Sequence, residues 1–163
     1  MTNTPDGGTI DLGGGELDEN ISGAISGALN PNSDEALEHA GQYYESVRKM
    51  TTDVENISKN TGYSLDEIQK VKEYIFYETH DLGDGRIDRF DSDFMMAQSW
   101  QRLIEGRDIK EHDLTLLKHE LLEHEYKDQG IPHNEAHILA SYKYNYSQEA
   151  EDYHAKISKH QKT

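Results

Sequence analysis

The chain has 163 residues and a formal net charge of -16 at pH 7, and its length suits one domain with or without a tail. So acidic a chain repels a phosphate backbone, and no cluster of Lys and Arg offsets the charge, so nucleic acid is not an expected partner. Cysteine is absent, which excludes disulfides and thiolate-bound zinc and leaves histidine and carboxylate as ligands for any metal. The sequence has no signal-peptide core and no long apolar run, so we expect a soluble protein with no membrane span and no signal peptide of its own.

The N-terminal segment contains few large apolar groups and is rich in Gly, Asn, Ser and Asp. This composition is typical of a linker, because it offers too little apolar surface to offset the entropy lost on ordering. Residues 1–31 are therefore predicted to form a flexible, glycine-rich arm, and residues 32–163 one helical domain.

Apolar residues recur at helical spacing through this domain, and no alternating β-branched run favours a sheet. The strongest local signal is the capping box of Ser64 with Glu67, which precedes an apolar stripe. Asp91 or Ser92 is expected to cap the next long helix. Helices are predicted to start near residues 33, 53, 65, 92, 111, 132 and 148. The fold class is therefore all-α, a compact bundle of five to seven helices.

The segment HDLGDGRIDRFD, residues 80–91, has the outline of a calcium loop between two helices. With Asp84 and Gly85 at the fifth and sixth positions, however, His80 and Leu82 stand where two carboxylates are required. We therefore favour a tight glycine-rich turn whose aspartates and arginines pair with one another. The alternative is that these arginines face an anionic ligand.

On a helical wheel, with about 100° between successive residues, the helix predicted at residues 111–128 presents two faces. One face is apolar and is expected to enter the core; its leucines are Leu114, Leu117, Leu121 and Leu122. The opposite stripe mixes polar and apolar side chains; it holds His112, Leu116, His119, Glu120, Glu123 and Tyr126. Because Leu116 and Tyr126 belong to this stripe, we expect another helix to cover it.

The same stripe contains the run His119-Glu120-Leu121-Leu122-Glu123, in which Glu123 replaces the second histidine of the zinc-binding H-E-x-x-H helix. His119 and Glu123 lie on successive turns and can share one zinc or another divalent ion, with His137 of the next helix as a third ligand. Glu120 is then a candidate general base on water. Two alternatives remain open: acid–base chemistry by His119 and Glu120 without metal, or a solvated polar face without function.

Four segments of the chain carry a resemblance to a known family: GALNPNSDEALEHAGQYYESVRK, NTGYSLDEIQKVKEYIFYETHDLGDGRIDRFDSDFMMAQSWQRL, HDLTLLKHELLEHEY and EAHILASYKYNYS. In these segments the chain resembles a domain found at the C-terminus of phage minor capsid proteins of the Mu-like head-morphogenesis type. Polymorphic toxins of Gram-positive bacteria end in a similar domain. The residues that match the pattern are His80, Arg89, Phe90, Asp91, Trp100, Arg102, His112, Asp113, Lys118, His119, Glu120, Glu123, His137, Tyr144 and Asn145.

The resemblance implies an effector domain delivered by a carrier, either a phage head or a secretion apparatus, with an immunity protein as a further partner. We expect such a toxin to be a hydrolase that acts on protein, peptidoglycan or nucleotide rather than on nucleic acid. The expected catalytic residues are His112, His119, Glu120, Glu123 and His137, and Arg89 and Arg102 are expected to contact charged groups of the substrate. The alternative is a non-enzymatic phage head or interaction domain that docks through its acidic surface.

Overall fold

The computed structural model describes residues 30–162, and this part of the chain forms seven helices and one small two-stranded sheet. The predicted all-α bundle is therefore confirmed. The arm predicted at residues 1–31 lies almost wholly outside the described residues. Among the helices at residues 30–162, none combines the length and the apolar character that a membrane crossing requires.

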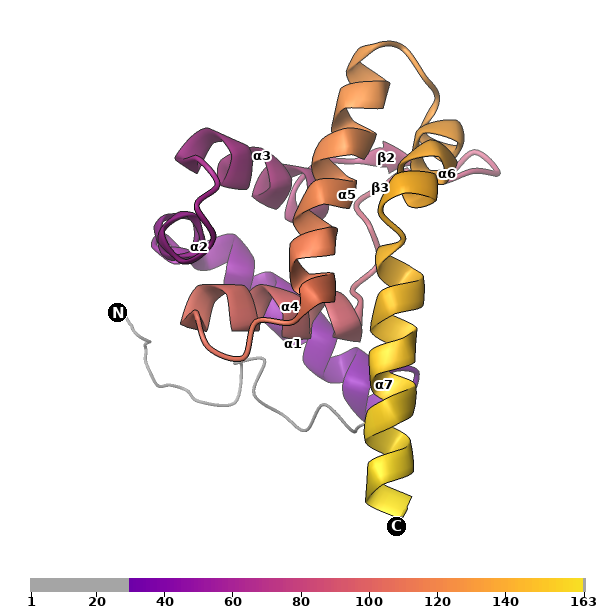
Figure 1. Cartoon of the computed structure of the whole chain (residues 1–163). Helices are drawn as coiled ribbons and strands as arrows, with labels where there is room; N and C mark the ends of the chain where they lie inside the picture. Colours follow the sequence, from indigo (N-terminus) through magenta and orange to yellow (C-terminus); the bar gives the residue numbers. More distant parts are fainter. Residues whose placement is uncertain (1–29, 163) are drawn as a thin grey trace.

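The elements in chain order are α1 (Asp34–Lys49), α2 (Asp53–Thr61), α3 (Leu65–Phe76), β2 (His80–Asp81), β3 (Ile87–Asp88), α4 (Phe94–Glu105), α5 (Glu111–Asp128), α6 (His133–Lys143) and α7 (Tyr146–Lys162). Helix α5 runs through the middle of the molecule, between α2 and α3 on one side and α6 and α7 on the other (Figure 1).

Side-chain caps begin several of these helices, as the sequence predicts. Ser33 accepts a hydrogen bond from the first turn of α1, and Ser64 and Glu67 form both bonds of the predicted capping box on α3. The cap of α4 is Asp93, however, and not Asp91 or Ser92. Asp91 is engaged elsewhere, because its carboxylate pairs with the guanidinium of Arg86 at 2.7 Å.

The segment between α3 and α4 is a short β-hairpin, which helical periodicity did not predict. His80 pairs with Asp88 in antiparallel register, and the turn is closed by the N–H of Leu82 donating to the carbonyl of Arg86 at 2.8 Å. The turn needs left-handed backbone conformations, and glycines supply two of them. This is the tight turn favoured from the sequence, with Arg86 pairing with aspartates, rather than a calcium loop between helices.

The core is continuous through α1, α2, α3, α4, α5 and α7. Trp100 of α4 is fully buried at its centre and contacts the ring of Phe76 edge-on, with 5.2 Å between the ring centroids. Asp53, the first residue of α2, is also buried and accepts bonds from Trp100 Nε1 at 3.2 Å and from Lys72 Nζ at 2.8 Å. A single carboxylate therefore joins α2, α3 and α4.

We predict that Asp53→Ala lowers the free energy of unfolding by about 3–5 kcal/mol, because it leaves the ammonium of Lys72 buried without its counter-charge. Urea denaturation followed by circular dichroism measures the change. Glu151→Ala, an exposed site on α7, is the control and should stay within about 0.5 kcal/mol of wild type. A loss below about 1 kcal/mol for Asp53→Ala would contradict the prediction.

Candidate metal site

Helix α5 buries its polar stripe more completely than its apolar face. On the stripe Leu116, His119, Glu120 and Glu123 are buried, whereas on the face expected to enter the core Leu117 is buried and Leu114, Leu121 and Leu122 are only half-buried. Helices α3, α4, α6 and α7 all contact α5. The covered stripe expected from the sequence is therefore confirmed, and the alternative of a solvated polar face is wrong.

The turn after α5 brings α6 back along it, so that two histidines of α6 reach Glu123. Gly130 stands in this turn with a φ of 93°, a left-handed conformation that glycine adopts without strain. His133 and His137 lie one helical turn apart on α6, and both direct Nδ1 at the Glu123 carboxylate, at 3.6 Å and 2.9 Å. The two helices therefore converge on a single buried carboxylate.

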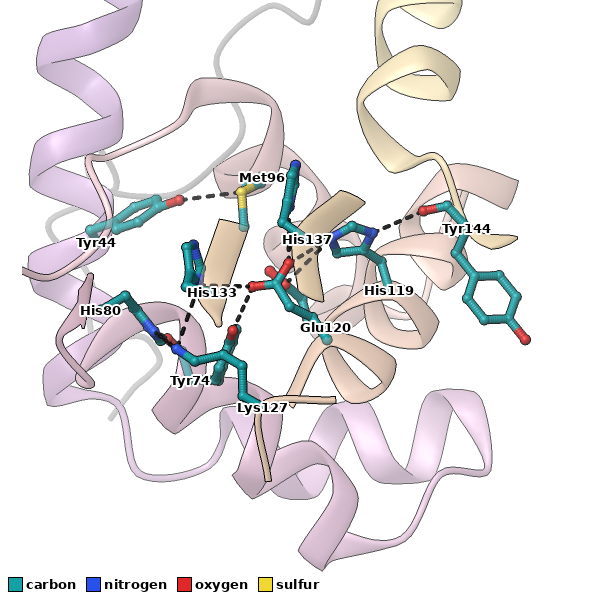
Figure 2. Close-up of polar contacts among 11 residues, drawn as sticks. Tyr44, Tyr74, His80, Met96, His119, Glu120, Lys127, His133, His137 and Tyr144 are labelled. Atoms are coloured by element: carbon teal, nitrogen blue, oxygen red, sulfur yellow. Dashed lines mark hydrogen bonds and ion pairs between the residues drawn. The ribbon is translucent and has the colours of Figure 1, made fainter. Parts of the chain in front are cut away.

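His119, Glu123 and His137 form a group that could hold a metal ion. Figure 2 labels the two histidines of this group. His119 Nε2 and His137 Nδ1 lie 3.0 and 2.9 Å from the same oxygen, Oε1 of Glu123. One ligand atom from each of the three residues lies within 4.8 Å of the other two. We call these three residues the triad.

The second nitrogen of His119 fixes the orientation of its ring. Nδ1 lies 2.9 Å from the backbone carbonyl oxygen of Tyr144, at the end of α6. Because a carbonyl oxygen only accepts, Nδ1 carries a proton and donates it, and a neutral His119 presents a lone pair at Nε2. Metal-binding histidines are commonly held in this way, with the other ring nitrogen donating to a carbonyl or carboxylate.

Glu123 is surrounded by donors on both carboxylate oxygens. The phenol of Tyr74, on α3, donates to Oε2, while His119 and His137 face Oε1. Burial alone would raise the pKa of Glu123, but the hydrogen bonds from His119, His137 and Tyr74 outweigh burial and hold the pKa well below its usual value. Glu123 is therefore an anion inside the fold.

Glu120 lies beside the triad, with Oε1 at 4.0 Å from His119 Nε2. It is buried, and no hydrogen bond reaches its carboxylate from the described residues. Burial, and after it the negative charge of Glu123, raise the pKa of Glu120 well above its usual value. The fold therefore favours the uncharged, protonated form of Glu120.

One side of the triad is open to solvent. The side chain of His137 is 54% exposed, whereas that of Glu123 is 1% exposed. The hydrogen bond to Glu123 raises the pKa of His137, and burial partly opposes this effect. A ligand could therefore reach the triad from the His137 side without unfolding α5.

The structure does not bring His112 to the triad. It lies at the start of α5, where Nε2 accepts a bond from Arg102 at 3.1 Å and the ring contacts those of Tyr146 and Tyr153. Arg102 is likewise engaged, because its guanidinium makes two bonds of 2.8 Å to the buried carboxylate of Asp113. These contacts form a structural cluster near α7, which the helix wheel did not separate from the triad.

Arg89, the other predicted contact for substrate charge, is exposed just after β3. Its backbone N–H donates to the side chain of Asp88 at 2.8 Å. Among the described residues, no hydrogen bond or ion pair joins the Arg89 side chain to the triad. The arrangement therefore offers no support for Arg89 as part of the site.

Sequence reasoning missed Tyr74 and His133, which contact Glu123 from α3 and α6. The available signal for Tyr74 was its place among the apolar residues of α3, since a buried phenol requires a hydrogen-bond partner. His133 carried a weaker signal, its spacing of four residues before His137 at the start of a helix. Neither signal points to Glu123, because these contacts span 49 and 10 residues of sequence.

Because His112 is buried, we expect the free energy of unfolding to depend on pH. Burial lowers the pKa of His112 to about 4, with Asp113 opposing and Arg102 reinforcing the shift. The folded state therefore favours the neutral ring, and its stabilisation is complete above pH 6.5 and is lost as the pH falls toward about 4. The loss reaches at most about 1.4 kcal/mol per pH unit.

His112→Asn should flatten this fall in the free energy of unfolding between pH 7 and pH 5, compared with wild type. Urea denaturation at a series of pH values gives both slopes, and the comparison of slopes is independent of any constant loss of stability in the variant. Equal slopes in the two proteins would contradict the assignment.

The triad, Glu120 and the donors around them are thus defined by geometry alone. No family model, no curated protein and no solved structure matches the chain.

Proposed function

We propose that this chain is a metal-dependent hydrolase domain in which His119, Glu123 and His137 bind one zinc or similar divalent ion. The observation that carries the proposal is the environment of His119. Its Nδ1 donates to the Tyr144 carbonyl, so Nε2 is the nitrogen that faces Glu123, at 3.0 Å. When His119 is protonated, Nε2 donates to the carboxylate; an ion that replaces this proton would be shared by Nε2 and Oε1 of Glu123, the same oxygen on which His137 converges.

The separations of the ligand atoms fit a small ion. Zinc bonds of about 2.0–2.1 Å to nitrogen and oxygen place tetrahedral ligand atoms roughly 3.3 Å apart. The contacts of 3.0 and 2.9 Å to Glu123 Oε1 are close to this value. The side chain of His137 is half-exposed, so an ion would enter the triad from this side.

The composition of the triad favours a catalytic site over a structural one. Catalytic zinc sites use three protein ligands and keep a fourth position for water or substrate, whereas structural sites are closed by four. The triad offers two histidines and one carboxylate, and it is open on the His137 side. The ion would supply Lewis acidity at this open position.

Glu120 is the group we assign to proton transfer. It follows His119 directly on α5 and stands three residues before Glu123, so it lies between the two ligands of this helix. Its carboxylate lies beside His119, and no donor in residues 30–162 forms a hydrogen bond with it. In hydrolysis the ionised form of Glu120 would take a proton from the attacking water and return it to the leaving group. Glu120 thus differs in role from Glu123, which is held by three donors and is not free to exchange protons.

The biological setting that we propose is a toxin-type effector delivered by a phage head or secretion apparatus and neutralised by an immunity protein. This part rests on the family resemblance of the sequence. The strong negative charge favours protein, peptidoglycan or nucleotide over nucleic acid as substrate. The competing proposal, a non-enzymatic head or docking domain, requires neither a metal nor toxicity.

We predict that the purified chain binds one equivalent of zinc at pH 7.5 and that His119→Ala and Glu123→Ala each weaken binding by more than about 100-fold, since each removes a ligand. Competition with a chromophoric chelator measures the affinity, and elemental analysis measures the stoichiometry. Glu120→Gln should bind zinc like wild type.

The control is His154→Ala, which removes a histidine of α7 that contacts Phe94 and Tyr153 instead of the triad. It should leave zinc affinity unchanged. A wild-type chain that binds no zinc when purified without chelator would exclude the metal site.

We further predict that expression in a bacterial cytoplasm arrests growth and that Glu120→Gln abolishes the arrest while retaining bound zinc. His154→Ala should remain toxic. Growth curves at matched protein levels provide the measurement. A harmless wild type would favour the docking domain, and a fully toxic Glu120→Gln variant would remove Glu120 from catalysis.

A further inference from the structure

Tyr74 is the one residue outside α5 and α6 that donates to Glu123 within residues 30–162. It is buried on α3, and its phenol proton binds Oε2, the oxygen that the triad histidines do not face. The carboxylate is therefore divided, with one oxygen directed at His119 and His137 and the other bound to Tyr74. This division bears directly on how Glu123 could bind an ion.

The Tyr74 ring is held in place by residues from the hairpin and from α5. His80 lies against it with 4.5 Å between ring centroids, Phe90 at 5.7 Å, and the ammonium of Lys127 lies 5.2 Å from its centroid. His80 also donates from Nε2 to the Tyr74 carbonyl at 2.8 Å and accepts from Lys127 at Nδ1. Packing on several sides thus prevents the phenol from turning away from Glu123.

We propose that Tyr74 is a positioning residue that reserves Oε1 of Glu123 for the ion and keeps this carboxylate monodentate. The inference rests on the proposed metal site. A carboxylate can bind an ion through one or two oxygens, and zinc sites expand from four to five ligands when a further donor becomes available. With Oε2 bound to the phenol, three protein atoms remain for the ion and a fourth position stays open for water.

The arrangement makes Tyr74 a determinant of geometry as well as of affinity. Outer hydrogen-bond partners orient metal ligands, and their loss typically reduces metal affinity by about 10- to 100-fold. Without the phenol, Glu123 is free to turn and offer both oxygens. The open position would then be partly filled by protein, which changes the coordination number of the ion.

The test is Tyr74→Phe, which removes one hydroxyl and keeps the ring. We expect zinc affinity, measured by chelator competition at pH 7.5, to fall by about 10- to 100-fold. We also expect the visible absorption of the cobalt(II)-loaded variant to weaken relative to wild type, because five-coordinate cobalt absorbs less strongly than four-coordinate cobalt. A general loss of fold stability would not by itself change this spectrum, so the spectrum separates a positioning role from a purely structural one.

Tyr43→Phe is the matched control. It makes the same change at a fully buried tyrosine whose phenol donates to Gln101 at 2.7 Å, away from the triad. It should leave zinc affinity and the cobalt spectrum unchanged. If wild type and Tyr74→Phe share the same affinity and spectrum, or if Tyr74→Phe binds more tightly, the inference is wrong while the metal site stands. If wild type binds neither ion, the proposed function itself fails.

Discussion

Glu123 places a carboxylate that is 1% exposed in the middle of the central helix, and an anion removed from water in this way must be compensated by donors or by a cation. The compensation comes from Tyr74 on α3, His119 on α5 and His137 on α6. These contacts tie three helices together at one point. The packing of α6 against α5, and of the hairpin against α3, can both be understood as enclosing this charge.

Part of this arrangement could be predicted from the sequence because it is local. The limits of α5 follow from its apolar periodicity, and the meeting of His119 with Glu123 follows from a separation of four residues on a helix. Leu116 within the polar stripe correctly indicated that this side of the helix is covered. Capping at Ser64 was equally readable, since the box needs residues only three apart.

The remainder depends on contacts between distant segments, which no local pattern encodes. The helical wheel grouped His112 with His119 because a wheel shows the angle of each residue around the helix axis and not its position along that axis. Two helical turns separate these residues, and α7 supplies the surroundings of His112 instead. The hairpin at His80 escaped notice because its strands have two residues each, too few for an alternating pattern. Tyr74 was not singled out from the sequence; it is buried in the core, and its hydroxyl has a specific partner.

The orientation of His119 depends on a backbone group, the carbonyl of Tyr144, and not on a side chain. A substitution at position 144 therefore leaves the acceptor in place as long as the chain keeps its course. An insertion or deletion in the short connection between α6 and α7 would displace the acceptor even if every side chain near Glu123 were retained. Tolerance to change in this region is thus set by the length of the connection rather than by the identity of its residues.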